Sequence, residues 1–355
     1  MFLAINEIIK EKSRFILITA VIVLVGYLVF FLTALAYGLA TSYTAALDKW
    51  DAGGIVLREN ANNNIGRSLL FESDYEDILS DDVAPLGVGA ATVELDQAED
   101  VSLFGINTDS FLSPEVASGR QIANAQEVVV SDELEKAGVQ LGDRIELQGA
   151  EMGYEVVGFV EKATFQTAPV VYMSLDDWRV AVSEVSGMLG MRDDTTISAV
   201  VTRGAEADNF SSDTKSWQPL QDFIFALPGY QAQVLTFSLM IGFLIGIAAF
   251  VLAIFIYILT MQKKNIFGVL KAEGVSNGYI GWSVMAQVAI LSVLGLAVGM
   301  ALAIATGVLL GAKVPFMINP IFFVGITALF LVCAALGGIV SVRSVTKIDT
   351  VEAIG

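Results

Sequence analysis

Four long stretches without a single charged residue constrain what this chain can fold into. They cover residues 15–47, 223–262, 274–312 and 314–342. Each is longer than the roughly 20 apolar residues that cross the hydrocarbon core of a membrane as a helix. Because unpaired backbone groups are costly in lipid, such stretches are expected to be helical. The sequence therefore predicts four transmembrane helices.

The charged residues are segregated along the chain. Residues 48–222 contain 33 Asp and Glu against 11 Lys and Arg, a balance of −22, so this segment accounts for the net charge of −18 of the whole chain. Segments 1–14, 263–273 and 343–355 together hold 8 basic and 5 acidic residues. Basic residues in short loops mark the cytoplasmic side. We therefore expect a multi-pass protein of the cell membrane, with both termini inside, the acidic segment outside, and no nucleic acid as a partner.

A cleaved signal peptide is the alternative for the first apolar stretch, since Ala34-Leu35-Ala36 resembles a cleavage site. However, the apolar region before it is longer than the usual length of about 7–15 residues. Four uncleaved spans also give a consistent topology. We therefore favour an uncleaved first helix.

The pattern predicts nine consecutive segments. They are an amphipathic inner-surface helix (1–14), a first transmembrane helix with a stalk (15–52), an extracytoplasmic domain (53–221), a second transmembrane helix (222–262), a short cytoplasmic helix (263–279), a third transmembrane helix (280–312), an outer loop (313–319), a fourth transmembrane helix (320–342) and a cytoplasmic tail (343–355).

The segment between the first two spans has the pattern of a mixed α+β domain. Short β-branched runs such as "EVVVS", "YEVVGFV" and "APVVYMS" predict strands. "SDELEKAGVQLGD" and "SLDDWRVAVSEVSGML" predict helices. The pair Gly87 and Gly89 is interpreted as a turn, and the asparagine-rich "ENANNNIG" as a turn or loop. The predicted fold is four transmembrane helices plus one α+β extracytoplasmic domain inserted between the first and second helices.

Glycines four residues apart recur in the predicted spans. The pairs are Gly242 with Gly246, Gly295 with Gly299, and Gly307 with Gly311. This spacing permits close helix contact, although glycine-rich spans also produce such pairs by chance.

The residue types that catalysis needs are scarce. The chain has no histidine and one cysteine, Cys333, so no Cys/His zinc cluster can form. No phosphate-binding P-loop motif occurs, so the chain is not an ATPase by itself. Acidic pairs such as Asp81 with Asp82 are interpreted as solvated loop charges, which leaves a carboxylate-only hydrolase without a specific candidate. We expect a non-enzyme without an intrinsic metal or cofactor.

The stretch "KKNIFGVLKAEGVSNGYIGW", residues 263–282, is a short charged interlude between two spans. One interpretation is an amphipathic helix that lies on the membrane surface. The other is a helix that docks Phe267 and Leu270 into a groove of a cytoplasmic partner.

This stretch resembles the coupling helix of FtsX-like ABC-transporter permeases, and Gly268, Leu270, Lys271, Ala272 and Gly274 match its motif. Glu273 departs from it, because a small or apolar residue is more usual there. The resemblance implies that a separate ABC ATPase docks at Ile266, Phe267, Gly268, Leu270, Lys271, Glu273 and Gly274.

Two further likenesses cover the rest of the chain. "GRQIANAQEVVVSDELEKAGVQLGDRIEL" is similar to the extracytoplasmic core domain of macrolide-exporter-type permeases. "YLVFFLTALAYGLATSYTAALDKWDAGGIVLRENANNNIGRSLL" is similar to Gram-positive haem-efflux permeases. The family implies a homodimer that sits in membrane lipid and works with two copies of the ATPase, which would bind ATP and Mg²⁺.

Haem as cargo would make the missing histidine informative, because the iron would need Tyr, Met, Cys or carboxylate ligands. The expected substrate-binding residues lie near the outer ends of the first two spans and in the first outer segments. They are Phe30, Phe31, Tyr37, Tyr43, Glu59, Glu72, Tyr230 and Met240. The alternative role for the aromatic residues is anchoring at the membrane interface.

The sequence thus favours the permease subunit of an ATP-driven ABC efflux complex that extrudes haem or a similar amphipathic toxin. Export of an antimicrobial peptide or a lipoprotein remains open. So does a non-transporting transmitter that controls a cell-wall hydrolase or a sensor. An anchored adhesion domain would leave the coupling motif unexplained.

Overall fold

The computed structural model describes residues 12–95, 97–187, 195–204, 210–262, 264–310 and 314–346. The chain forms two compact units. We call Met1–Gly38 with Val234–Gly355 the helical unit, and Leu39–Gln233 the sheet domain. Most of the predicted inner-surface helix and most of the predicted cytoplasmic tail lie outside the described residues.

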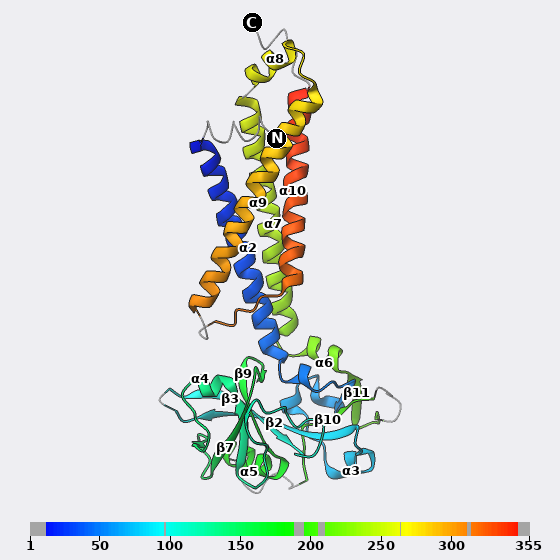
Figure 1. The fold of residues 1–355 in the computed structure, drawn as a ribbon. Helices are drawn as coiled ribbons and strands as arrows, with labels where there is room; N and C mark the ends of the chain where they lie inside the picture. Colours follow the sequence, from blue (N-terminus) through cyan, green and yellow to red (C-terminus); the bar gives the residue numbers. More distant parts are fainter. Residues whose placement is uncertain are drawn as a thin grey trace. The chain divides into compact units, whose positions relative to one another are not determined.

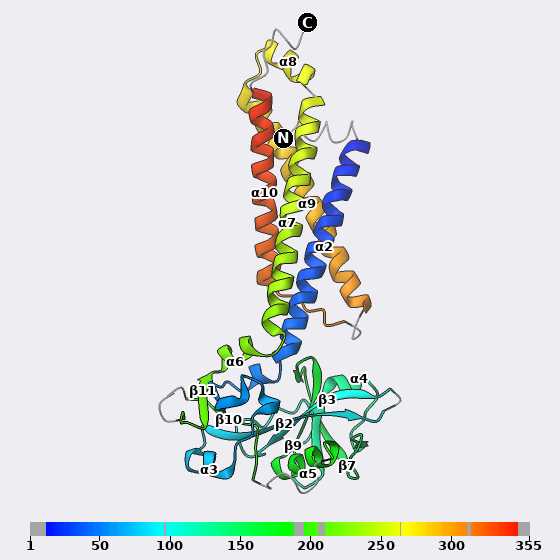
Figure 2. The same cartoon turned by 180° about the vertical axis from the view of Figure 1, so that it is seen from behind.

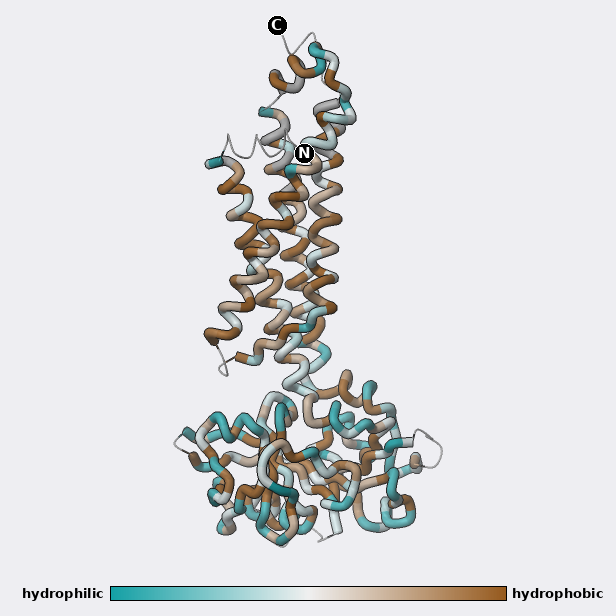
Figure 3. The backbone as a smooth tube through the Cα atoms, viewed as in Figure 1, coloured by the Kyte–Doolittle hydropathy of each residue, from teal (hydrophilic) through white to brown (hydrophobic). Residues whose placement is uncertain are grey.

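Four long helices run through the helical unit (Figure 1). They are α2 (Lys12–Thr44), α7 (Tyr230–Gln262), α9 (Asn277–Leu310) and α10 (Pro320–Thr346). Each contains at least 20 consecutive residues that are apolar enough to cross a membrane. Figure 3 shows hydrophobic residues along these helices and mixed polarity in the sheet domain. The prediction of four transmembrane helices is confirmed.

The second transmembrane helix begins later in the structure than predicted. Residues 220–226 form a separate short helix, α6 (Leu220–Ala226), and α7 begins only at Tyr230. Pro228 has no N–H for a continuous helix, and Gly229 has a left-handed φ of 83°. The chain therefore bends between α6 and α7.

Helices α2 and α9 cross with their backbones in contact. A Cβ atom on Gly299 would lie 2.8 Å from the amide nitrogen of Tyr27 and 2.9 Å from the carbonyl oxygen of Val23. A Cβ atom on Gly295 would lie 2.5 Å from the Ile22 side chain. At this glycine pair the helices make the close contact that the spacing permits, because only glycine lets them approach this far.

The other glycine pairs behave differently. Gly242 and Gly246 on α7 have no atom of the described chain within 4 Å of a Cβ position. Gly307 accommodates the ring of Phe316, while Gly311 lies outside the described residues.

The outer loop predicted at residues 313–319 packs closely where it is described. The Met317 amide donates a hydrogen bond to the Ala34 carbonyl of α2 at 3.2 Å. A Cβ atom on Gly38 would lie 1.8 Å from the Pro315 carbonyl oxygen, so only glycine fits at this point of α2.

The sheet domain is built on one eleven-stranded sheet of described residues, in the order β11-β1-β10-β2-β3-β9-β5-β7-β4, with β6 on β7 and β8 on β9. The β3–β9 and β5–β7 pairs are parallel, whereas the other pairs are antiparallel. The strands are β1 (Gly54–Arg58), β2 (Val83–Val93), β3 (Glu99–Ile106), β4 (Ser118–Gly119), β5 (Glu127–Ser131), β6 (Arg144–Glu146), β7 (Gly153–Val160), β8 (Thr164–Phe165), β9 (Ala168–Ser174), β10 (Ala199–Thr202) and β11 (Lys215–Pro219).

Short helices accompany the sheet, which confirms the predicted α+β class. They are α3 (Glu72–Tyr75), α4 (Asp132–Lys136), α5 (Leu175–Val185) and α6, with 3-10 turns η1 (Leu47–Lys49), η2 (Glu59–Ala61), η3 (Ile65–Arg67) and η4 (Glu76–Ile78). The asparagine-rich stretch forms η2 and η3, as the turn prediction expects. Asn62 and Asn63 there have left-handed φ values of 50° and 57°.

The interpretation of Gly87 and Gly89 as a turn is wrong, because both lie inside strand β2. The indole of Trp178, from α5, packs onto this strand. A Cβ atom on Gly87 would lie 2.3 Å from the Trp178 ring, and one on Gly105 of β3 would lie 2.4 Å from the Trp178 Cβ atom. The glycines therefore make room for a buried tryptophan.

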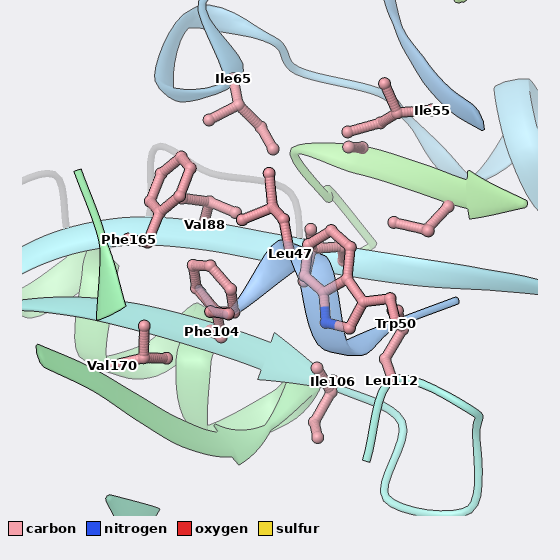
Figure 4. Close-up of a cluster of buried hydrophobic side chains, with 14 of the residues drawn as sticks. Leu47, Trp50, Ile55, Ile65, Val88, Phe104, Ile106, Leu112, Phe165 and Val170 are labelled. Carbon is pink, nitrogen blue, oxygen red and sulfur yellow. The ribbon is translucent and has the colours of Figure 1, made fainter. Parts of the chain in front are cut away.

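Both connections to the long helices supply side chains to one hydrophobic cluster of the sheet domain, in which Figure 4 shows Leu47 and Trp50. Leu47 and Trp50 follow α2 in the chain, and Phe223 belongs to α6. The Trp50 ring lies 5.8 Å from the Phe104 ring of β3, centroid to centroid. Residues from both connections of the sheet domain therefore pack into the same hydrophobic core.

The Trp178 packing gives a direct test. We expect Gly87→Ala to destabilise the sheet domain by about 1–3 kcal/mol, because the added methyl group overlaps a fully buried ring. Thermal unfolding of the full-length protein measures this loss.

Gly204→Ala is the matched control, because a Cβ atom there has no described residue within 4 Å. An unchanged unfolding temperature for Gly87→Ala would contradict the packing described for Trp178.

Candidate functional site

The stretch that carries the coupling motif forms helix α8 (Lys264–Ala272) and a turn before α9. This helix is shorter than the predicted segment 263–279. The Val275 amide donates to the Leu270 carbonyl, and the Gly274 amide donates to the Lys271 carbonyl, each at 3.0 Å. Gly274 has a φ of 91°. These features are those of a Schellman cap, so the motif glycine ends α8 and redirects the chain.

The side chains of α8 divide between the core of the helical unit and solvent. Leu270 and Val275 pack against the hydrophobic core of the helical unit. Ile266 and Val269 are 52% and 48% exposed. The pattern predicts Leu270 as an outward anchor, but this side chain is half-buried; among the described side chains of α8, the exposed apolar residues are Ile266 and Val269. Val269 is absent from the predicted set, although its spacing of three residues from Ile266 indicates a shared helix face.

The remaining predicted contact residues of α8 and its turn vary in their surroundings. Gly268 is buried, Lys271 is half-buried, and Glu273 and Gly274 are exposed. The side chain of Phe267 lies outside what the structure describes.

Two of the predicted substrate-binding residues come together. Tyr43, near the end of α2, and Tyr230, the first residue of α7, lie 5.5 Å apart between ring centroids. The Tyr43 hydroxyl donates a hydrogen bond to the Pro228 carbonyl at 2.5 Å. Both side chains are half-buried. The two helices therefore present a pair of phenols at the point where each joins the sheet domain in the chain.

The other aromatic candidates pack within the helical unit. Phe30 is 1% exposed and stacks on Phe323 with a centroid distance of 5.0 Å. Phe31 lies against Tyr27 and Phe316, and Tyr37 meets the edge of Phe322. Met240 is half-buried on α7. The Phe30 ring is buried and already stacks on Phe323, so it is not free to stack on a ligand.

The two carboxylate candidates lie elsewhere in the sheet domain. Glu59 begins η2 and Glu72 begins α3, and both are exposed. Figures 1 and 2 place α3 across the sheet from α6. Within the described ranges, no group of three or more carboxylate or thiol residues is arranged to hold a metal ion.

An apolar groove of about 750 Å³ lies between α2 and α9 in the helical unit. Ile16, Val23 and Leu294 contribute to its walls, with Lys12 and Tyr27 as polar contributors. None of the eight predicted substrate-binding residues lines it. Sequence patterns did not indicate this groove, because it depends on where two helices diverge from their crossing.

The residues "GRQIANAQE" begin the stretch that is similar to macrolide-exporter-type permeases, and their pattern has a structural explanation. Both terminal guanidinium nitrogens of Arg120 donate to the Glu127 carboxylate, at 2.6 and 2.7 Å. The Ala123 and Asn124 amides donate to the same carboxylate. Arg120 holds the pKa of Glu127 well below its usual range, against the effect of burial. This stretch therefore shapes a loop rather than a binding site.

Known proteins resemble this chain along its whole length. Residues 15–216 match the MacB-like periplasmic core domain, and residues 238–350 match the FtsX-like permease C-terminal domain. The chain is 26% identical to a Staphylococcus epidermidis protein and 24% identical to a Staphylococcus haemolyticus protein, both bearing the name hemin transport system permease protein HrtB. Each alignment covers 100% of this chain and 99% of the relative.

Among solved structures, the extracellular domain of the noncanonic ABC-type transporter YknZ from Gram-positive bacteria is similar at 15% identity and a TM-score of 0.31. That similarity covers 44% of this chain and 86% of the other. The MacB-like match spans more than half of this chain, and the FtsX-like match spans most of the remainder. The chain therefore belongs to the FtsX-like permeases with a MacB-like periplasmic core domain, which are membrane subunits of ABC transporters that depend on a separate ATPase.

Proposed function

We propose that this permease exports haem, or a similar amphipathic molecule, from the membrane as a homodimer with two ATPase subunits. The full-length likeness to proteins named for hemin transport supports the cargo. The observation that carries the proposal is the pairing of Tyr43 with Tyr230. Tyrosine is an established protein ligand of haem iron, and this chain has no histidine to supply instead.

In this proposal, ATP and Mg²⁺ bind only to the partner ATPase. Closure of the ATPase pair moves α8, and the movement passes along the helices because α2 and α7 each continue for 33 residues. The ATPase thereby shifts the population between permease conformations. The tyrosine pair holds the cargo in one conformation and releases it in the other, and a phenol ligand without a histidine favours release.

Haem binding tests the tyrosine pair. We expect the purified permease with its ATPase to bind haem saturably, near one per homodimer, with a shifted Soret band. Tyr43→Phe and Tyr230→Phe are expected to weaken binding at least about tenfold, because each removes a candidate ligand or its orienting neighbour. Absorption titration measures both effects.

Tyr257→Phe is the matched control, since this exposed phenol also lies on α7 but is far along the helix from Tyr230. Absence of a saturable Soret shift, or equal binding by all three variants, would overturn the haem proposal. The assignment to the permease family would stand.

Docking of the ATPase tests the exposed face of α8. We expect Ile266→Asp combined with Val269→Asp to reduce co-purification of the ATPase by about 10- to 30-fold, because apolar anchors dominate such contacts. Leu270→Asp is expected to lower the amount of folded permease instead, since Leu270 packs against the core.

Ile318→Asp serves as the control, because it makes the same kind of substitution at an exposed apolar position in the connection between α9 and α10, and each single α8 variant matches its charge. Undiminished co-purification by the double α8 variant would exclude this face as the docking surface.

We further propose that the termini and α8 are cytoplasmic, from the basic charge of their segments. In a Cys333→Ser background, a membrane-impermeant maleimide should label Asp213→Cys on intact cells and Asn277→Cys only after permeabilisation. Both positions are exposed. The reverse labelling pattern would invert the proposed orientation.

A further inference from the structure

The apolar groove between α2 and α9 is a cavity that the proposed haem export does not use. Its volume of about 750 Å³ lies within the range of known ligand sites. Among its lining residues, Phe15 and Leu291 are buried, whereas Ile16, Leu24 and Leu294 are 66%, 58% and 54% exposed. The groove therefore opens to the surroundings of the helical unit, which in a membrane are acyl chains wherever no second protein covers them.

The groove follows one side of α2 over several turns. Its lining residues on this helix run from Lys12 to Tyr27 in alternating steps of three and one residues, which keeps them on one helix face. At about 1.5 Å per residue, this face is about 22 Å long. It ends where α9 crosses α2, at the contact of Gly299 with the Tyr27 amide (Figures 1 and 2). The acyl chains of one leaflet fill about 15 Å, half of the hydrocarbon core, so a single chain that begins beside Lys12 fits along the groove.

The walls of this groove favour hydrocarbon over a polar ligand. The Thr19 hydroxyl donates to the Phe15 carbonyl at 2.8 Å, so it needs no partner from a ligand. Tyr27, at the end away from Lys12, stacks its ring on Phe31. The other lining residues apart from Lys12 are apolar. A hydrocarbon chain in such a groove makes the dispersion contacts that an empty groove would lose.

Lys12 gives the groove one charged end. Its side chain is exposed, and it is the one charged residue among the described residues that line the groove. A cation at the end of an apolar groove complements a lipid whose headgroup carries a net negative charge. With the orientation proposed above, this end lies at the cytoplasmic leaflet, where anionic lipids are concentrated.

We propose that this groove binds one acyl chain of an anionic phospholipid, whose phosphate group lies beside Lys12. A second copy of the chain fits less well, because a two-fold axis along the membrane normal would bring both Lys12 ammonium groups to the same depth at one interface. Only the choice of leaflet rests on the proposed orientation, and the maleimide labelling described above tests that orientation separately.

The test uses the full permease–ATPase complex in phosphatidylcholine nanodiscs. The probe is a phosphatidylglycerol with a photoactivatable diazirine halfway along one acyl chain, and mass spectrometry of peptides locates its cross-links. We expect cross-links to the lining residues of α2 and α9, and unlabelled phosphatidylglycerol should compete for them better than phosphatidylcholine does. Lys12→Gln should lower this labelling by about fivefold, as expected for one cation beside an anionic headgroup, whereas Lys12→Arg should retain it.

A second variant fills the groove itself. Ala20 lines the groove and is exposed, so Ala20→Phe adds a ring without crowding the core. We expect it to remove most of the groove cross-links while the amount of folded complex stays unchanged. Ala328→Phe is the matched control, because it adds the same ring at an exposed position of α10 outside the groove, and it should leave the cross-links in place.

Several results would overturn the proposal. They are equal competition by phosphatidylcholine, labelling that Lys12→Gln leaves unchanged, or equal losses for Ala20→Phe and Ala328→Phe. A disulfide between two copies that carry Ile16→Cys in a Cys333→Ser background would show that a second copy covers the groove, and would exclude the lipid as well. These outcomes are independent of the haem titration, because Tyr43 and Tyr230 do not line this groove.

Discussion

The sheet domain depends on one hydrophobic cluster that receives both of its chain connections. Leu47 and Trp50 enter this cluster after α2, and Phe223 of α6 enters it before α7. Burying large side chains from both connections stabilises them by several kcal/mol, at about 1.5–3 kcal/mol for each side chain. The same arrangement brings Tyr43 beside Tyr230, and both side chains pack against this cluster. The anchoring of the connections and the tyrosine pair therefore share residues.

The distribution of charged residues along the chain follows from the cost of placing charge in a membrane. Charged groups are absent from the four apolar stretches, because burying them in lipid is costly. Polar function is left to α8 and to the sheet domain. On α8, Ile266 and Val269 remain exposed while Leu270 and Val275 close the helix against its core. This division gives a short helix one face for its own unit and one exposed face, on which we propose that the partner ATPase docks.

Several predictions succeeded because they rested on strong local constraints. Uncharged length located the spans, and β-branched runs located strands such as β5, β7 and β9. The sequence pattern did not predict strand β2, because its glycines and Pro85 are typical of turns. Its glycines are explained by Trp178 and Val182 of α5, about ninety residues further along the chain. Likewise, the spacing of α8 showed an amphipathic helix, but it did not show that Leu270 faces inward.

The sequence by itself determined the number of spans, the α+β class of the inserted domain and the presence of a coupling motif. These features depend on composition, periodicity and residues close together in the chain. Only the tertiary structure decided that Tyr43 meets Tyr230, that Phe30 is buried against Phe323, and that Trp178 fills the space beside Gly87 and Gly105. Such contacts join residues far apart in sequence. These contacts depend on how whole helices and strands pack together, so a local sequence pattern cannot predict them.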